Sequence, residues 1–374
     1  MSFASVQTDN FIEAKKLAVN ENKPILIDFM TDWWSSCKAF ARVATTDPQI
    51  QELLNSVVLL TVDCEKGEGP ELKETFSVPG YPTFVLTNAK GETIFRWIGY
   101  EKDFFIESIQ TGMSDLSTIV EKLARFQNKP DEATANIIAN FHDSKGEYKE
   151  AATFYKKAAD LSINHEKDYS MSIFWAQYYG MRKELFTIDE LKQAANSALN
   201  SDAASDEDKN YVLYYMCRFI PDNKNDAELL DYLKKAEAKM GEAGENTNKR
   251  ISDQINISYA LFIEKNAKKA IELKKTSLPE GWEDEARQLN GFSWWCFENE
   301  INLEEAEKLA LKGVELAEPG NEKAQILDTL AEIQNLLGKT EEAIKTLKLA
   351  VKEAPDTEYY SKQLARFEKR IKTQ

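Results

Sequence analysis

The chain has 374 residues, of which 43% are hydrophobic and 11% aromatic, so it is too long for one ordinary domain and can bury two cores. Its 63 acidic and 47 basic side chains leave a formal net charge of -16, which excludes nucleic acid and anionic membrane surfaces from the expected partners. No apolar run approaches the roughly 20 residues that span a bilayer, so no membrane insertion is expected.

Cysteine and histidine are scarce and scattered, which argues against metal and cofactor chemistry. The four cysteines stand far apart, without a CxxC pair or a cluster with histidine, at Cys37, Cys64, Cys217 and Cys296. Zinc sites and disulfide frameworks both need closer spacing. The two histidines, His142 and His165, fall in helix-like segments and complete no catalytic triad with the N-terminal region. We therefore expect no metal and no cofactor.

The start of the chain bears on its location. The first six residues lack a charged segment followed by an apolar stretch, so the chain as written carries no export signal. A soluble, cytoplasmic protein is then the expectation. Residue 11 already belongs to the first predicted helix, so an export signal that was removed and replaced by Met1 is the alternative, with a periplasmic location. The compartment stays open.

Residues 1–115 have the pattern of a compact α/β domain. Apolar residues at helical spacing alternate with short apolar, β-branched runs that are typical of buried strands. The predicted helices are 11–19, one that begins near 35, 48–54, 71–76 and 103–109, and the predicted strands are 25–30, 57–62, 82–86 and 93–98. After the leading helix, this order reads βαβαββα.

Residues 116–374 predict an all-α domain, because nearly every segment is an amphipathic helix followed by a short polar turn. Gly146–Ala151 matches Gly338–Ala343, and Asn302–Ala306 is a looser copy. Each copy opens a helix that carries small residues on one face, and small residues let neighbouring helices approach closely.

This pattern resembles the tetratricopeptide repeat at about 135–163, 290–319 and 327–356. Residues 167–282 show helices without a legible repeat. A helical-repeat domain with these three copies is therefore predicted for the C-terminal part of the chain.

Four motifs follow one another in the N-terminal region. Residues 28–38 read Asp-Phe-Met-Thr-Asp-Trp-Trp-Ser-Ser-Cys-Lys where a strand passes into a helix, and Tyr81-Pro82-Thr83 leads into another strand. Gly99 follows the last strand, and residues 62–69 form the loop Val-Asp-Cys-Glu-Lys-Gly-Glu-Gly. Together they resemble the thioredoxin family over roughly residues 10 to 112. The resemblance implies a thioredoxin-like α/β fold for this region.

In that family the active segment reads Trp-Cys-x-x-Cys-Lys, with an exposed nucleophilic cysteine at the helix N-terminus and a resolving cysteine one turn further in. Cys37 and Lys38 match the second cysteine and the lysine, but Trp34 occupies the nucleophile position. Thiol-disulfide exchange needs one thiolate to attack and a second to release the mixed disulfide. The dithiol is therefore incomplete, and we expect Cys37 to be a buried thiol rather than a redox sensor.

The resemblance assigns Asp28 to the position of the family's buried carboxylate behind the dithiol, where burial raises the pKa. Without a dithiol, Asp28 is either an inherited strand-end carboxylate that backbone or water satisfies, or a remnant of lost redox chemistry. Cys64 follows Asp63 at the end of a neighbouring strand, so a bridge from Cys37 to Cys64 is a further alternative. Such a bridge needs Cα atoms within about 7 Å.

Pro82 resembles the family's cis-proline, which lies beside the active segment and shapes the groove for an extended substrate peptide. Trp33, Trp34, Tyr81 and Pro82 would make that groove aromatic, which favours hydrophobic peptide contact over chemistry. The alternative is that Trp34 only plugs the groove.

We therefore expect a protein that binds a protein or peptide partner through the aromatic groove and the helical repeats. The alternative function is a thiol-disulfide oxidoreductase acting through Cys37 and Asp28, with Cys64 or an external thiol as the second sulfur. A third reading is that Trp34 is an introduced substitution of a natural cysteine.

Overall fold

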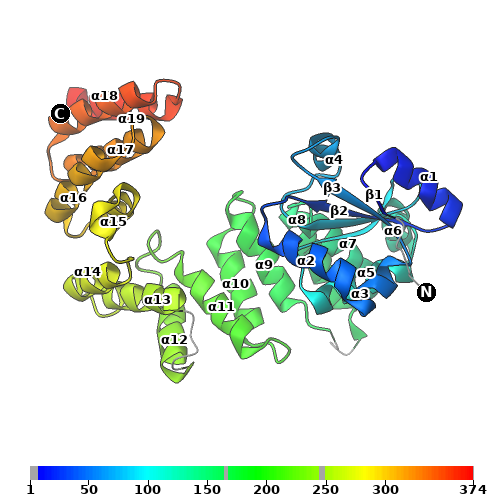
Figure 1. Ribbon diagram of the computed structural model, residues 1–374. Coiled ribbons are helices and arrows are strands. Elements are labelled where there is room, and N and C mark those ends of the chain that lie inside the picture. The colour runs from blue at the N-terminus through cyan, green and yellow to red at the C-terminus, as the bar shows by residue number, and fades with distance from the viewer. Residues whose placement is uncertain (1–6, 164–166, 244–248, 374) are drawn as a thin grey trace. The chain divides into compact units, whose positions relative to one another are not determined.

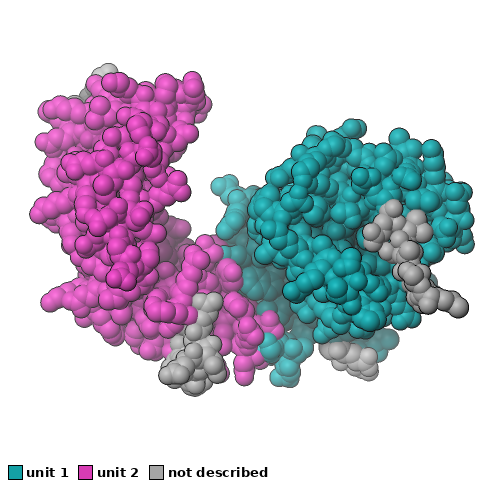
Figure 2. All heavy atoms as spheres, viewed as in Figure 1, with its two compact units in different colours: residues 1–205 teal, residues 206–374 magenta. Residues whose placement is uncertain are grey.

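A computed structural model describes residues 7–163, 167–243 and 249–373 of the chain. It contains two compact units, residues 1–205 and residues 206–374, coloured teal and magenta in Figure 2. We call them the N-terminal unit and the C-terminal unit. The predictions for the first six residues and for His165 lie outside the described residues.

The N-terminal unit is built around a sheet of five strands in the order β1-β3-β2-β4-β5, of which β1, β2 and β3 are labelled in Figure 1. The strands are β1 (Gln7–Thr8), β2 (Ile25–Met30), β3 (Val58–Asp63), β4 (Thr83–Thr87) and β5 (Thr93–Ile98). Strand β2 pairs parallel with β3 and antiparallel with β4, which pairs antiparallel with β5. The βαβαββα order predicted from the sequence is confirmed. Strand β1 was not predicted, because it is too short to show a hydrophobic periodicity.

Helices cover both faces of this sheet. One face packs against α1 (Phe11–Glu21) and α4 (Gly69–Thr75), and the other against α2 (Ser35–Thr46), α3 (Pro48–Leu54) and α5 (Lys102–Ser114). Successive side chains of a strand point to opposite faces, so Leu26 enters the core under α2 while Ile27 enters the core under α1. The burial of both faces explains why the strands read as nearly continuous apolar runs.

The edge strand β5 carries a buried arginine that binds three backbone carbonyls. Arg96 donates hydrogen bonds to the carbonyl oxygens of Phe76 at 2.6 Å, Ser77 at 3.2 Å and Ser144 at 3.0 Å. Burial lowers its pKa to about 10, which leaves the guanidinium charged at neutral pH. Because Ser144 follows α7 (Glu132–Asp143), this one side chain ties the sheet to a helix outside the α/β region.

A buried lysine makes a second tie between β5 and the helices that follow. The Nζ atom of Lys122, on α6 (Ile119–Asn128), donates to the carbonyl oxygen of Asp115 at 2.8 Å and to that of Ile94, on β5, at 3.3 Å. Helices α6 and α7 pack against β5, so the edge of the sheet is covered. The boundary that we place at residue 115 remains a proposal, and the compact unit continues to residue 205.

The rest of the N-terminal unit is a series of helices that pack on their sequence neighbours. After α6 and α7 come α8 (Tyr148–Leu161), α9 (Ser170–Met181) and α10 (Ile188–Leu199). Helices α7 and α8 form the hairpin predicted at 135–163, and Ala151 and Ala158 are buried on α8 as its small-residue face requires.

The C-terminal unit also consists of helices that pair in chain order. They are α11 (Asp206–Cys217), α12 (Ala227–Ala243), α13 (Lys249–Phe262), α14 (Ala267–Thr276), the short 3-10 helix η3 (Trp282–Asp284), α15 (Ala286–Asn299), α16 (Leu303–Leu316), α17 (Asn321–Leu336), α18 (Thr340–Glu353) and α19 (Glu358–Thr373). The segments predicted as repeats at 290–319 and 327–356 lie in the hairpins α15/α16 and α17/α18. Residues 167–282, where the sequence showed no repeat, also contain paired helices.

Two glycines provide a test of the local backbone in this unit. Gly338 follows α17 at φ +78°, a conformation that costs a residue with a Cβ atom about 1–2 kcal/mol, and an added Cβ would meet no atom within 4 Å. Gly338→Ala should therefore lower the free energy of unfolding by about that amount. Gly291, inside α15, also has open space, so Gly291→Ala should raise it by up to about 1 kcal/mol.

Urea unfolding of the full chain, followed by circular dichroism, measures both changes. Effects of the same sign at the two positions would contradict the assignment of a left-handed turn at Gly338.

Candidate functional site

The site predicted from the sequence lies where β2 passes into α2. Trp34 is the N-cap of α2, with φ -79° and ψ 126°, and its carbonyl accepts the amide of Lys38 at 3.2 Å. A tryptophan side chain cannot accept the hydrogen bonds that serine or aspartate accepts at this position. The helix therefore begins with its first amides uncapped by Trp34, and an indole stands where the resemblance expects a nucleophilic thiol.

Trp33 and Trp34 form an exposed aromatic pair. Their exposed fractions are 57% and 42%, and their rings meet edge to face with centroids 5.4 Å apart. The indole Nε1 of Trp33 donates to both carboxylate oxygens of Glu65 at 3.2 Å. Two large apolar side chains are therefore presented to solvent at a helix start, with one of them held by a hydrogen bond.

Cys37 lies one turn further into α2 and is only 2% exposed. Burial is the main cause that raises the pKa of its thiol, a backbone hydrogen bond at Thr31 partly offsets it, and the charge of Asp28 raises the pKa further. The thiolate is the attacking species in disulfide exchange, and a buried thiol with a raised pKa supplies little of it at neutral pH. The structure thus places Cys37 as a shielded, protonated thiol.

Asp28 lies in β2, opposite Thr61 of β3 and Phe84 of β4. It is buried, and burial raises its pKa to about 7. Its Oδ1 atom has no hydrogen-bond partner among the described residues, and the same holds for the hydroxyl of Thr31 at the end of the strand. This carboxyl group is therefore near half-protonated at neutral pH, the state in which it can exchange a proton.

Cys64 and Tyr81 form a second small group. Cys64 is buried directly after β3, and its amide donates to the carbonyl of Met30 at 2.9 Å. Burial is the main cause that raises its pKa to about 11, against a hydrogen bond with Tyr81. The ammonium of Lys73 lies 5.1 Å from the ring centre of Tyr81. Cys37 and Cys64 are both free, so the bridge considered between them is not formed in this structure.

The peptide bond between Tyr81 and Pro82 is cis, as the resemblance implied. The carbonyl of Pro82 accepts the amide of Gly99 at 2.8 Å, which fixes this turn against the end of β5. Trp33 thus contacts Trp34, and Tyr81 contacts Cys64, while the charge of Asp28 raises the pKa of both cysteines.

Sequence reasoning missed the charged residues that surround the aromatic pair. Glu65 holds Trp33, and Lys66 forms ion pairs with Asp32 and, at 2.7 Å, with Asp63. The hydrogen bond and the ion pair with Lys66 lower the pKa of Asp63. Residues 63–66 lie in the loop motif 62–69, but their spacing does not predict partners that lie about 30 positions earlier in the chain.

The described residues also bear on metal binding and on membrane insertion. No group of three or more histidine, cysteine, aspartate or glutamate side chains there has the arrangement of a metal site. None of the helices within those residues combines the length and the apolar character that crossing a membrane requires.

Known family models match segments in both parts of the chain. A family model described as thioredoxin-like matches residues 7–89, and a tetratricopeptide repeat model matches residues 134–164 and 324–357. The thioredoxin resemblance and the copies predicted at 135–163 and 327–356 are thereby confirmed. The looser copy at 290–319 is not among the matched segments and stays a prediction.

Individual relatives match about a quarter of the chain. Proteins named thiol:disulfide interchange protein DsbD are 31% identical over 91 residues in Photorhabdus laumondii and 30% identical over 105 residues in Ralstonia nicotianae, which is 24% and 27% of this chain. The matches span only 16% and 17% of those proteins. A solution structure described as a "putative disulphide-isomerase" from Bacteroides thetaiotaomicron is 31% identical over 30% of this chain and 95% of its own, with a TM-score of 0.28.

The buried carboxyl of Asp28 predicts a pH dependence of stability. Its pKa is raised from 3.8 to about 7, so the folded state keeps a proton that the unfolded state has already lost. Stability therefore falls as the pH rises from about 4 to about 7. Asn stays neutral, so Asp28→Asn should match the wild type near pH 4 and exceed its free energy of unfolding by up to about 4 kcal/mol above pH 7.

Thermal unfolding of both proteins across this pH range makes the measurement. Asp9→Asn, which removes an exposed carboxylate, is the control. Parallel curves for wild type and Asp28→Asn would show that Asp28 is not desolvated as the structure describes.

Proposed function

Because residues 7–89 of the chain are a thioredoxin-like domain and tetratricopeptide repeats follow them, we propose that it is a binding protein or adaptor built on a thioredoxin scaffold without the redox dithiol. Its partner is a protein or peptide. The aromatic pair Trp33 and Trp34 and the helical repeats are its contact surfaces.

The observation that carries this proposal is the contrast between Trp34 and Cys37. Trp34 occupies the helix start and is 42% exposed, whereas the only thiol on α2 is 2% exposed and has a raised pKa. A thioredoxin mechanism needs the accessible position to hold the attacking sulfur. An indole there offers a large apolar contact surface instead, and tryptophan is among the residues that dominate binding energy at interfaces.

The surroundings of Trp34 also favour a contact surface over a plug. Trp33 packs edge to face on Trp34 and is held by Glu65, so less side-chain freedom is lost when a partner docks. The repeats add a separate surface of the kind that binds peptides or helices.

The alternative function is a thiol-disulfide oxidoreductase that acts through Cys37. Three features favour it: Asp28 keeps a pKa of about 7, the cis bond before Pro82 is present, and similar segments occur in proteins named for thiol:disulfide interchange. In that case Cys37 would attack, and Cys64 or an external thiol would release the mixed disulfide. Both cysteines are buried, which argues against this alternative function.

Loss of the exposed indole should weaken partner binding. Trp34→Ala is expected to reduce capture of the bound partner by the full chain about tenfold or more, because it removes a central aromatic contact. Phe104→Ala is the matched control, since Phe104 lies on α5 and is 44% exposed. Quantitative cross-linking and mass spectrometry of the captured proteins would compare the three chains, and equal capture by all three would refute a role of Trp34 in binding.

Restoring the missing cysteine should test the scaffold. Trp34→Cys recreates a Cys-x-x-Cys segment with Cys37, and we expect it to reduce insulin disulfides with dithiothreitol as electron source while the wild type stays silent. A variant that combines Trp34→Cys with Cys37→Ser is the control and should not complete the cycle. Turnover by the wild type would instead favour the oxidoreductase.

A further inference from the structure

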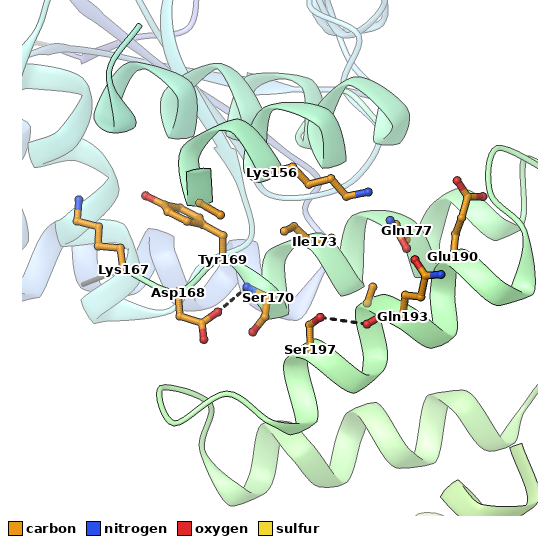
Figure 3. A pocket seen from close by; sticks show the side chains of 12 residues that line it. Lys156, Lys167, Asp168, Tyr169, Ser170, Ile173, Gln177, Glu190, Gln193 and Ser197 are labelled. Atoms are coloured by element: carbon orange, nitrogen blue, oxygen red, sulfur yellow. Dashed lines mark hydrogen bonds between the residues drawn. The ribbon is translucent and has the colours of Figure 1, made fainter. Parts of the chain in front are cut away.

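The N-terminal unit contains a cleft of mixed polar and apolar lining away from the β2–α2 junction. It has a volume of about 420 Å³ and lies between α8, α9 and α10 (Figure 3). Lys156 comes from α8, Gln177 from α9, and Glu190 and Gln193 from α10, with Ser197 further along the same helix. The volume falls within the range of ligand pockets.

Gln177 is the least ordinary residue in this cleft. It is 1% exposed, and its Oε1 atom accepts no hydrogen bond from the described residues. A buried acceptor without a partner costs about 1–3 kcal/mol, so such groups are rare unless a ligand or water serves them. A ligand that donates an N–H group in the cleft would remove this cost.

The charges that line the cleft nearly balance, which limits the chemistry of a ligand. Lys167 pairs with Glu132 at 3.2 Å, and Asp168 accepts the amide of Ser170 at 2.6 Å. Hydrogen bonds from Thr187 are the main cause that lowers the pKa of Glu190, with a smaller contribution from the charge of Lys156. Among the described residues that line the cleft there is no excess of cations for a phosphate and no group of carboxylates for a metal ion.

Carboxamides and hydroxyls remain as the groups that can select a ligand. Figure 3 shows the side chains of Gln177, Gln193 and Ser197 directed from α9 and α10 around the cleft. The Ser197 hydroxyl donates to the backbone carbonyl of Gln193 at 3.1 Å and still has lone pairs to accept with. A glutamine side chain has the same acceptor and donor groups as a peptide bond, so a neutral, amide-rich chain matches this lining.

We propose that this cleft binds an extended peptide segment through its backbone amides, with the Oε1 atom of Gln177 accepting a peptide N–H and Gln193 contacting the peptide at the rim. The inference rests on the proposed function as a binding protein. It adds a contact surface on α8, α9 and α10 that is separate from Trp33 and Trp34.

Selection from a phage-displayed library of random heptapeptides on the full chain tests the proposal. The dissociation constant of an enriched peptide is then measured by fluorescence anisotropy with Gln177→Leu, Gln334→Leu and Trp34→Ala beside the wild type. Gln177→Leu keeps the size of the side chain and removes the acceptor, and we expect it to weaken binding about tenfold or more. Gln334→Leu should bind as the wild type does, whereas Trp34→Ala shows whether the enriched peptide docks on the aromatic pair instead of the cleft.

Thermal midpoints separate a binding role of Gln177 from a structural one. Gln334 is also buried but accepts the Thr346 hydroxyl at 2.8 Å, so Gln334→Leu should lower the midpoint, whereas Gln177→Leu should not. A midpoint lowered equally by both variants, or unchanged peptide affinity of Gln177→Leu, overturns the inference. So does displacement of the peptide by an equal concentration of N-acetylglycine methylamide, which would show that a lone amide suffices.

The two proposals fail in different ways. A peptide whose binding is lost only with Trp34→Ala overturns the cleft and supports the aromatic pair. A peptide lost only with Gln177→Leu supports the cleft, and the role of Trp34 is then decided by the capture experiment. A selection that enriches no peptide overturns the cleft alone.

Discussion

The buried guanidinium of Arg96 is the constraint on which the N-terminal unit depends. A charge removed from water is costly unless its hydrogen bonds are replaced, and here three backbone carbonyls accept from the two Nη atoms, while Nε has no partner among the described residues. Two of these carbonyls, at Phe76 and Ser77, lie just before the segment that leads to Tyr81, and the third ends α7. One side chain at a sheet edge therefore positions both the cis-proline turn and the first repeat.

The candidate site shows one physical cause acting on several groups. Removal from water disfavours the charged form, so it raises the pKa of Asp28, Cys37 and Cys64 alike. These side chains are held by packing, and packing resists substitution in a core. The exposed nucleophile position carries no such constraint, which explains how an indole can stand at Trp34 above an otherwise thioredoxin-like interior.

The parts of the molecule that follow a local period were predictable from the sequence. The apolar runs predicted β2 and β3. The small residues around Ala151 and Ala343 predicted two hairpins, and the repeat family model matches both. Arg96 and Glu65 were missed because their partners are distant in sequence and follow no period. The cleft was also unpredictable, since an unpaired Gln177 acceptor is a property of three packed helices and not of any one of them.

The sheet and the first repeat share one apolar core, and this determines how the N-terminal unit unfolds. Phe95 and Trp97 of β5 lie in the same apolar cluster as Ile138 of α7 and Ala151 of α8. Separating the α7/α8 hairpin from the sheet would expose this cluster to water. It would at the same time remove the carbonyl of Ser144 from the guanidinium of Arg96. The sheet and the first repeat therefore belong to one foldon, in which native-state hydrogen exchange of β5 and of α7 occurs through the same opening event.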